Sequence, residues 1–330
     1  MVPVTIKDIA KVASVSHTTV SRALKGHPAI SAETTAHIRQ LAKEMGYIPS
    51  AVAQSLLSQQ TNTIGVVLTS IADPFTVHIV GGVEEVAQAA GYSVFLSTSH
   101  NDPQKEMAVV ETLHRRRVDA IIVIASRVGS LYSARLEQLQ VPIVLVNNQQ
   151  EGHYLRSVAV NDEQGAQLAV DHLLGLGHKR IAYIGATDRP RSNRRRLKGY
   201  QKAMAAANAA PENNIILHPT ANTDIKQGQA ALSLLLAAGA TAVFCYNDLM
   251  AIGLLMAARQ QGVAVPQDLS VMGFDDIDPA CYITPSLTTI RQPRLELGRR
   301  AMNMALDLLN GKEVQDQTLK CELVVRESTA

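Results

Sequence analysis

The chain of 330 residues contains no tryptophan and only three cysteines, Cys245, Cys281 and Cys321. The cysteines lie too far apart along the sequence for the spacing of a metal site, and an odd, small number argues against a disulfide framework. We therefore predict that the protein binds no metal ion and works in a reducing compartment, the cytoplasm.

Charged residues are also scarce, at 18% of the chain against 46% hydrophobic residues. This balance excludes a disordered chain and supplies enough apolar side chain for a sizeable core. At roughly 100 to 200 residues per domain, the length predicts two or three folded units. No apolar signal-peptide core follows Met1, so we expect no secretion.

One uncharged run, residues 227–247, reaches the roughly 20 residues that a membrane-spanning helix needs. The run contains Gln227 and Gln229, and Gly239 interrupts it near the middle. We interpret it as a buried helix, a glycine stop and a strand, and we expect no membrane partner.

Positive charge is concentrated at the N-terminus. The whole chain has a net charge of +2, whereas residues 1–60 hold six Lys and Arg against three Asp and Glu, a net charge of +3. This distribution indicates a polyanionic partner for the first segment.

The first segment has the pattern of three short helices. Thr5, with Asp8 three positions later, is typical of a capped helix start. Ser16 is the natural N-cap of a second helix over residues 17–24, and Ser31 begins a third. The sequence therefore predicts a three-helix bundle that contains a helix-turn-helix.

In a helix-turn-helix the second helix lies in the DNA major groove, so its outer side chains contact the duplex. Arg22 can hold a guanine edge bidentately, His17 and Thr18 can reach base edges, and Ser16 and Thr19 suit phosphate contacts. The alternative is a structural bundle with solvated polar faces. The candidate DNA contacts are Thr5, Ser16, His17, Thr18, Thr19, Ser21 and Arg22.

The segment from Thr5 to Leu24, TIKDIAKVASVSHTTVSRAL, closely resembles the lactose/galactose repressor family of bacterial transcription regulators. The resemblance covers essentially the whole chain. It continues through residues 46–56, 64–67, 72–75, 177–181, 247–248, 273–276 and 285–291.

This resemblance implies a domain order of 1–48 for DNA binding, 49–61 for a hinge, and 62–330 for effector binding and dimerisation. A helix as short as the one over residues 50–57 is marginal in water unless something docks it. In the family, two hinge helices pair in the minor groove, where the residue matching Leu56 wedges between base pairs. Ala53 is a further candidate DNA contact, and a plain linker is the alternative.

The rest of the chain alternates apolar strands with helical patterns, which predicts parallel, doubly wound α/β sheets covered on both faces. The predicted strands are residues 63–68, 92–96, 119–124, 142–146, 180–184, 241–244 and 269–272. The resemblance implies a two-lobed, periplasmic-binding-protein-like domain. Its lobes would comprise residues 62–160 with 289–318, and 161–288 with 319–330.

Ligands of open parallel sheets bind beyond the carboxyl ends of the strands, where this sequence places acids, amides, an arginine and a ring. Such groups suit a sugar, because they can pair its hydroxyls and cover its C–H face. Capping by Asp73 and Asn247, turn roles for the late acids and a solvated Arg196 are the alternatives. The candidate effector contacts are Asp73, Phe75, Ser126, Asn147, Ser192, Arg196, Asn247 and Asp275.

Five arginines crowd into residues 189–196, which is more positive charge than a neutral sugar requires. Because arginine binds carboxylate and phosphate bidentately, a sugar acid or sugar phosphate is one hypothesis, and a solvated face is the other. Residues 221–223 lack the aromatic side chain that several family members place against the ligand, so no named effector is transferred.

The function we predict is a cytoplasmic, nucleoid-associated repressor of carbohydrate genes: a homodimer on a palindromic operator, with affinity set by the effector. An α/β enzyme and a transport sugar-binding protein are the rival classes. The sequence has no Walker loop, nucleophile elbow or Gly-x-Gly-x-x-Gly turn, so we expect neither enzymatic activity nor a cofactor.

Overall fold

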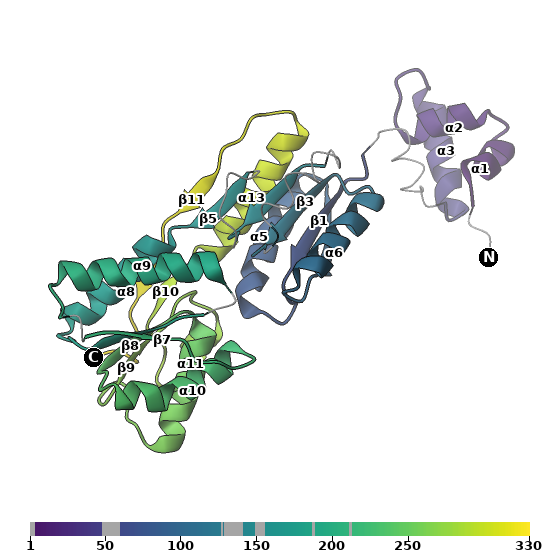
Figure 1. Cartoon of the computed structure of the whole chain (residues 1–330). Helices are drawn as coiled ribbons and strands as arrows, with labels where there is room; N and C mark the ends of the chain where they lie inside the picture. The colour runs from purple at the N-terminus through teal and green to yellow at the C-terminus, as the bar shows by residue number, and fades with distance from the viewer. Residues whose placement is uncertain are drawn as a thin grey trace. The chain divides into compact units, whose positions relative to one another are not determined.

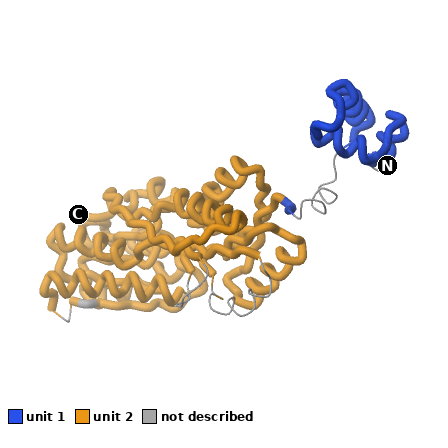
Figure 2. Tube along the Cα trace, turned by 90° about the horizontal axis from the view of Figure 1, so that it is seen from above, with its two compact units in different colours: residues 1–61 blue, residues 62–330 orange. Residues whose placement is uncertain are grey.

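The computed structural model divides into two compact units, residues 1–61 and 62–330, which Figure 2 colours separately. Ala53 and Leu56, the two hinge candidates, lie outside the described residues. The structure describes residues 4–47, 60–126, 128, 141–148, 156–186, 189–210 and 213–330.

The first unit is a three-helix bundle, as the sequence predicts. Its helices are α1 (Ile6–Val12), α2 (His17–Leu24) and α3 (Ala32–Glu44). The Asp8 carboxylate accepts a hydrogen bond from the Thr5 N–H at 2.8 Å, and the Ser16 hydroxyl accepts one from the Thr19 N–H at 3.0 Å. Satisfied donors at the helix starts fix where each helix begins. The buried core comprises Ile9, Ala10, Val20, Ala23, Ile38 and Ala42.

The second unit is built on two parallel sheets (Figure 1). The larger has the order β11 (Gln317–Leu319), β5 (Ser157–Val160), β4 (Ile143–Val146), β3 (Ala120–Ile124), β1 (Thr63–Leu68), β2 (Ser93–Thr98). The smaller has the order β7 (Asn214–Leu217), β6 (Ile181–Ile184), β8 (Ala242–Cys245), β9 (Ser270–Met272). A two-stranded antiparallel ribbon joins β10 (Thr289–Arg291) to β12 (Glu322–Val324).

We call the larger sheet and its helices lobe 1. These helices are α5 (Pro74–Ala89), α6 (Pro103–Arg115) and α13 (Arg294–Leu309). Val66 of β1 packs on the side of α5 and α13, whereas its neighbour Val67 packs on the side of α6. Because successive strand residues point to opposite faces, a sheet covered on both sides needs apolar residues at every position.

Lobe 2 is the smaller sheet with its helices and the ribbon. Its helices are α8 (Asp162–Gly175), α9 (Pro190–Ala206), α10 (Asp224–Ala237), α11 (Asp248–Gln261) and α12 (Pro279–Tyr282). Tyr183 and Phe244 pack with α8 and α9, and Ala182 and Val243 pack with α10 and α11. Figure 1 shows these helix pairs on opposite faces of the sheet. The predicted two-lobed, doubly wound fold class is therefore confirmed.

The chain passes between the lobes in three places. It leaves lobe 1 after Val160 at the end of β5 and enters α8. It returns between β10 and α13, and it crosses again between β11, which pairs with β5, and β12. Three backbone segments therefore connect the two lobes. Connections of this kind permit hinge closure around a ligand.

The long uncharged run forms the end of α10 and then β8. Gly239 separates the two with a left-handed φ of +61°, which a residue with a Cβ rarely adopts. Within the described ranges, no helix has both the length and the apolar character to cross a membrane.

Glycines bring the helix backbones into contact in both lobes. A Cβ added to Gly298 of α13 would lie 2.0 Å from the Ile79 carbonyl oxygen of α5, and one added to Gly82 would lie 2.1 Å from that of Leu295. A Cβ added to Gly228 of α10 would lie 1.9 Å from the Met250 carbonyl oxygen of α11. Such contacts leave no room for a side chain, so these helix crossings require glycine.

Gly298→Ala should destabilise the protein by about 1 to 3 kcal/mol, because the added methyl forces α13 away from α5. Gly175→Ala is the matched control, since Gly175 is helical, exposed and has nothing within 4 Å of an added Cβ. It should stabilise the protein by up to about 1 kcal/mol. Urea unfolding of both variants checks the pair, and equal effects would show that α13 and α5 adjust without strain.

Candidate functional site

The second helix of the first unit presents a polar face to solvent. His17, Thr18 and Arg22 are exposed, and Ser21 is half-buried. Val20 of the same helix is fully buried in the bundle core. The inner face therefore fixes the helix, and the outer face offers donors and acceptors to a partner.

Ser16 and Thr19 hold the start of this helix. Their hydroxyl oxygens lie 2.9 Å apart, and Ser16 also accepts the Thr19 N–H. Thr5 is exposed at the start of α1, where its N–H and hydroxyl both donate to Asp8. These hydrogen bonds lower the pKa of Asp8, which keeps the cap charged.

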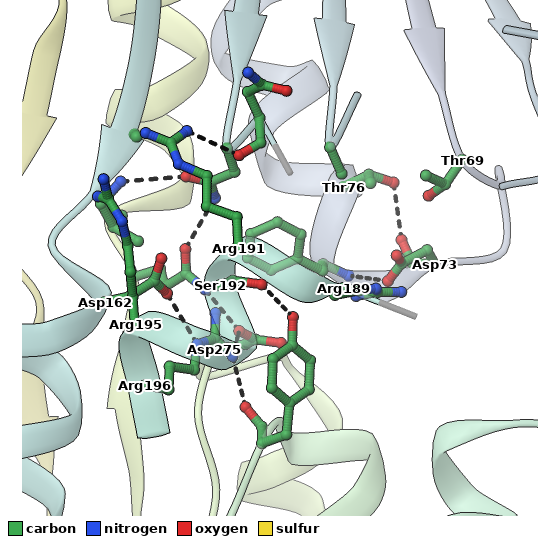
Figure 3. Close-up of a pocket in the computed structure, with 18 residues that line it drawn as sticks. Thr69, Asp73, Thr76, Asp162, Arg189, Arg191, Ser192, Arg195, Arg196 and Asp275 are labelled. Atoms are coloured by element: carbon green, nitrogen blue, oxygen red, sulfur yellow. Dashed lines mark hydrogen bonds and ion pairs between the residues drawn. The ribbon is translucent and has the colours of Figure 1, made fainter. Parts of the chain in front are cut away.

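In the second unit, one pocket lies beyond the carboxyl ends of the strands of both sheets. It holds about 600 Å³ of narrow space between side chains, part of it open to solvent. Figure 3 shows Asp73 and Thr76 on one side of this pocket and Arg196 with Asp275 on the other. The lining residues are Thr69, Asp73, Phe75, Thr76, Ala125, Asn147, Asn148, Ala159, Val160, Asp162, Arg189, Arg191, Ser192, Arg195, Arg196, Tyr246, Asp275 and Gln292.

Arg196 is the buried charge of the pocket, with only 4% of its surface exposed. Its Nε donates to Asp162 Oδ1 at 2.9 Å, and its Nη1 donates to the Tyr246 carbonyl at 2.5 Å. The guanidinium also stacks on the Phe274 ring, 3.7 Å from the centroid. Burial alone would lower the pKa of Arg196, but Asp162, Tyr246 and Asp275 outweigh it and hold that pKa above its ordinary value.

Asp275 faces Arg196 across 3.8 Å, but it does not behave as a simple ion-pair partner. Burial raises the pKa of its carboxyl to about 8, and Arg196 only partly opposes this shift. The residue also has a φ of 127°, which non-glycine residues rarely adopt. Strained backbone is found most often at functional sites.

A chain of amides links the lobes through Asp275. Gln292 donates from Nε2 to Asp275 Oδ1 at 2.6 Å, and its Oε1 accepts from Asn147 Nδ2 at 3.1 Å. Asn147 in turn accepts the Val160 N–H at 3.2 Å. Asn147 follows a lobe 1 strand and Asp275 follows a lobe 2 strand, so the orientation of each side chain depends on the other lobe.

The structure brings six of the eight predicted effector contacts together around this pocket. They are Asp73, Phe75, Asn147, Ser192, Arg196 and Asp275. Asp73 also caps α5, which was the alternative for this residue, because its carboxylate accepts the Phe75 N–H at 3.0 Å.

The other two, Ser126 and Asn247, do not line the pocket. The Ser126 hydroxyl donates to Glu106 of α6 at 2.5 Å, on the far side of the larger sheet. Asn247 caps α11 by accepting the Met250 N–H at 2.9 Å, and its amide donates to Asp224 at 2.6 Å. A residue that follows a strand is predicted to lie at the carboxyl end of the sheet. The sequence does not predict to which face of the sheet its side chain points.

Sequence reasoning missed Gln292, Asp162 and Tyr246 as lining residues. Gln292 follows a three-residue strand that carries no periodic signal, and Asp162 lies just after a strand of four residues. Tyr246 directly precedes Asn247 and, like it, follows a predicted strand, so the argument from strand ends could have included it. Its hydroxyl lies 2.7 Å from that of Ser192.

Two family descriptions match the chain: the lacI family of bacterial regulatory proteins over residues 5–50, and the periplasmic binding protein-like domain over residues 170–329. The chain is 33% identical over 327 residues to the HTH-type transcriptional repressor PurR of Photobacterium profundum, which covers 98% of each chain. This chain belongs to the lacI family. It is a DNA-binding regulator of transcription and not an enzyme.

Solved structures of this family show the same architecture. The lac repressor dimer bound to operator and the anti-inducer ONPF is 30% identical, with a TM-score of 0.87 over 99% of each chain. A lacI family regulator from Enterococcus faecium with bound ribose is 30% identical, with a TM-score of 0.74 over 81% of this chain and 98% of that one.

The raised pKa of Asp275 predicts a stability change with pH. An ordinary Asp ionises near pH 4, so the unfolded chain releases this proton first. The contribution of Asp275 to the free energy of unfolding is therefore fully present below about pH 4 and is lost as the pH rises through about 8. Between about pH 5 and pH 8.5, the wild type should lose about 1 kcal/mol or more beyond the loss in Asp275→Asn.

Chemical unfolding at the two pH values measures this difference. Asn at position 275 can still accept the hydrogen bond from Gln292, so the substitution removes the titration and keeps the shape. Asp307→Asn, at an exposed acid paired with Lys312, is the control and should follow the wild type. Parallel curves for wild type and Asp275→Asn would show that Asp275 titrates normally.

Proposed function

We propose that this protein is a dimeric, sugar-responsive repressor that acts on the bacterial nucleoid in the cytoplasm. The observation that carries the proposal is the joining of an exposed polar α2 to a two-lobed polar pocket within one chain. A repressor needs both parts, because it must read DNA and respond to a small molecule. The repressor PurR of Photobacterium profundum aligns with this chain over 98% of both sequences, which supports the proposal.

The exposure of His17, Thr18 and Arg22 on α2 supports the proposed DNA contacts. In the proposal, Arg22 pairs with a guanine edge, His17 and Thr18 with neighbouring base edges, and Ser21 with an adjacent group. Thr5, Ser16 and Thr19 stand at helix starts, where hydroxyl and N–H groups meet phosphates. In the proposal, Ala53 and Leu56 contact the minor groove.

Arg22→Ala should weaken binding to a duplex selected by the wild-type protein from a random pool about 10- to 100-fold, because a bidentate base contact is lost. Arg39→Ala removes the same charge from the exposed face of α3 and should cost less than about threefold. Fluorescence anisotropy at two salt concentrations measures both. Equal losses for the two variants would mean that α2 binds DNA by charge alone.

The pocket chemistry favours a small polyhydroxylated effector. Asn147, Ser192, Arg196 and Asp275 offer donors and acceptors from both lobes, and Phe75 offers a ring for a C–H face. The ribose-bound regulator from Enterococcus faecium supports this assignment by its likeness over 81% of this chain. A nucleoside also carries hydroxyls, so nucleosides belong in any screen of effectors.

The response to the effector would act through the relation of the two lobes. A ligand between Asn147 and Asp275 replaces or reinforces the amide chain through Gln292. Because the lobes are joined by three backbone segments, a change in this chain alters their mutual angle. A ligand that prefers one angle by about 1 to 3 kcal/mol changes operator affinity about 5- to 150-fold.

Dimerisation is proposed on the exposed apolar residues of lobe 1. The edge strand β2 exposes Phe95 and Leu96 by 50% and 46%, and Ile71 before α5 is 70% exposed. Uncovered apolar residues on a sheet edge are typical of protein interfaces. The lac repressor structure, which is a dimer, supports this proposal by its likeness over the full chain.

Phe95→Lys should weaken the dimer at least about tenfold, because it buries a charge in an apolar contact. Operator affinity should fall with it, since two half-sites need two copies. Leu236→Lys, at a similarly exposed leucine of α10, is the control and should leave the dimer intact. Sedimentation velocity over a dilution series decides the matter, and an unchanged dimer in Phe95→Lys would place the interface elsewhere.

A further inference from the structure

Among the described residues that line the pocket, positive charges outnumber negative ones. Four guanidinium groups reach it, from Arg189, Arg191, Arg195 and Arg196, all on or next to the start of α9. The acids among its described lining residues are Asp73, Asp162 and Asp275. Figure 3 shows Arg191, Arg195 and Arg196 on one side of the pocket and Arg189 beside Asp73 on the other.

The excess is larger than this count, because two of the acids are already committed. Asp162 forms the buried ion pair with Arg196 at 2.9 Å. Burial raises the pKa of Asp275 to about 8, which weakens its negative charge near neutral pH. Asp73 is the remaining acid among the described lining residues, which also include Arg189, Arg191 and Arg195.

The backbone adds to the same field. The N-terminus of a helix is its positive end, and acidic residues are normally favoured in the first turn. The first turn of α9 has no acid. Cations gathered at the positive end of a helix repel one another, and a bound anion relieves this repulsion.

A solvated basic face does not account for the pattern. The exposed cations of α9 lie on another side of the helix, where Lys198 and Lys202 pair with Glu163. Arg191 and Arg195 are only partly exposed and line the pocket. The Arg191 Nη1 also donates to the Asn148 carbonyl of lobe 1 at 2.9 Å, so Arg191 reaches across to the opposite lobe.

We propose that the effector carries an oxyanion, a phosphate or a carboxylate on a small polyol, which Arg191 and Arg195 bind. This inference rests on the proposed effector role of the pocket. Planar guanidinium groups bind both kinds of oxyanion bidentately, so the chemistry is common to sugar phosphates and sugar acids. Arg196, held by Asp162, is left to orient the polyol together with Asn147.

Calorimetric titration of the full-length protein with matched probes tests the charge. The probes are ribose and its terminal phosphate ester, glucose and its terminal phosphate ester, gluconate, and inorganic phosphate alone. At least one charged probe should bind at least about tenfold more tightly than its neutral parent, with the margin shrinking at high salt. The phosphate esters against gluconate decide between phosphate and carboxylate.

Substitutions locate the contact. Arg191→Gln and Arg195→Gln should each remove about tenfold or more of the preference for the charged probe and leave the binding of the neutral parent unchanged. Arg194→Gln removes the same charge from the exposed part of the same helix and should behave as the wild type. Two separate variants guard against a fold effect from losing the Arg191 contact to Asn148.

Operator binding, measured in parallel by anisotropy, separates the two levels of the proposal. If charged and neutral probes bind equally and operator affinity responds to both, the proposal of an anionic effector is overturned. The proposed function then still holds. Operator binding that responds to none of the probes overturns both the anion and the effector role assigned to the pocket. Binding of inorganic phosphate with no preference between esters and parents means an anion site unrelated to the effector, and it overturns the inference.

Discussion

A single buried guanidinium organises the centre of the second unit. Arg196 is held by Asp162 from the start of α8, by the Tyr246 carbonyl after β8 and by the ring of Phe274 after β9. A charge in such surroundings is stable only when its partners are all in place, because removing one leaves the rest uncompensated. The ends of three elements are therefore fixed relative to α9, and α9 in turn positions the remaining pocket arginines.

This constraint also explains the state of Asp275. The ion pair with Asp162 already satisfies Arg196, so Arg196 lies 3.8 Å from Asp275 and only partly offsets the cost of its burial. Gln292 then becomes the closest partner of Asp275 and connects it to Asn147 in the other lobe. A pocket built this way joins the two lobes by hydrogen bonds between weakly charged groups, which a ligand can exchange at modest cost.

Much of the fold could be predicted from local pattern. Ser16 and Ser31 mark helix starts because a short side chain can accept an N–H within the same turn, and both do so in the structure. The apolar run at 63–68 is a strand with those bounds because both of its faces are covered. The strands β5, β7, β10, β11 and β12 were not predicted, because each has only three or four residues and includes a polar side chain, so none forms a clear apolar run. The predicted dimer and hinge contacts stay predictions.

The helix-turn-helix, the parallel sheets and six side chains of the pocket could be predicted from the chain alone, since caps, periods and strand ends are local properties. Contacts between distant segments set the rest: Ser126 turns to Glu106, and Asn247 is used as a cap. Such contacts also make Gln292 the connection between the lobes and raise the pKa of Asp275. These depend on which distant segments meet and on how much water they exclude, and neither quantity is encoded in the spacing of neighbouring residues.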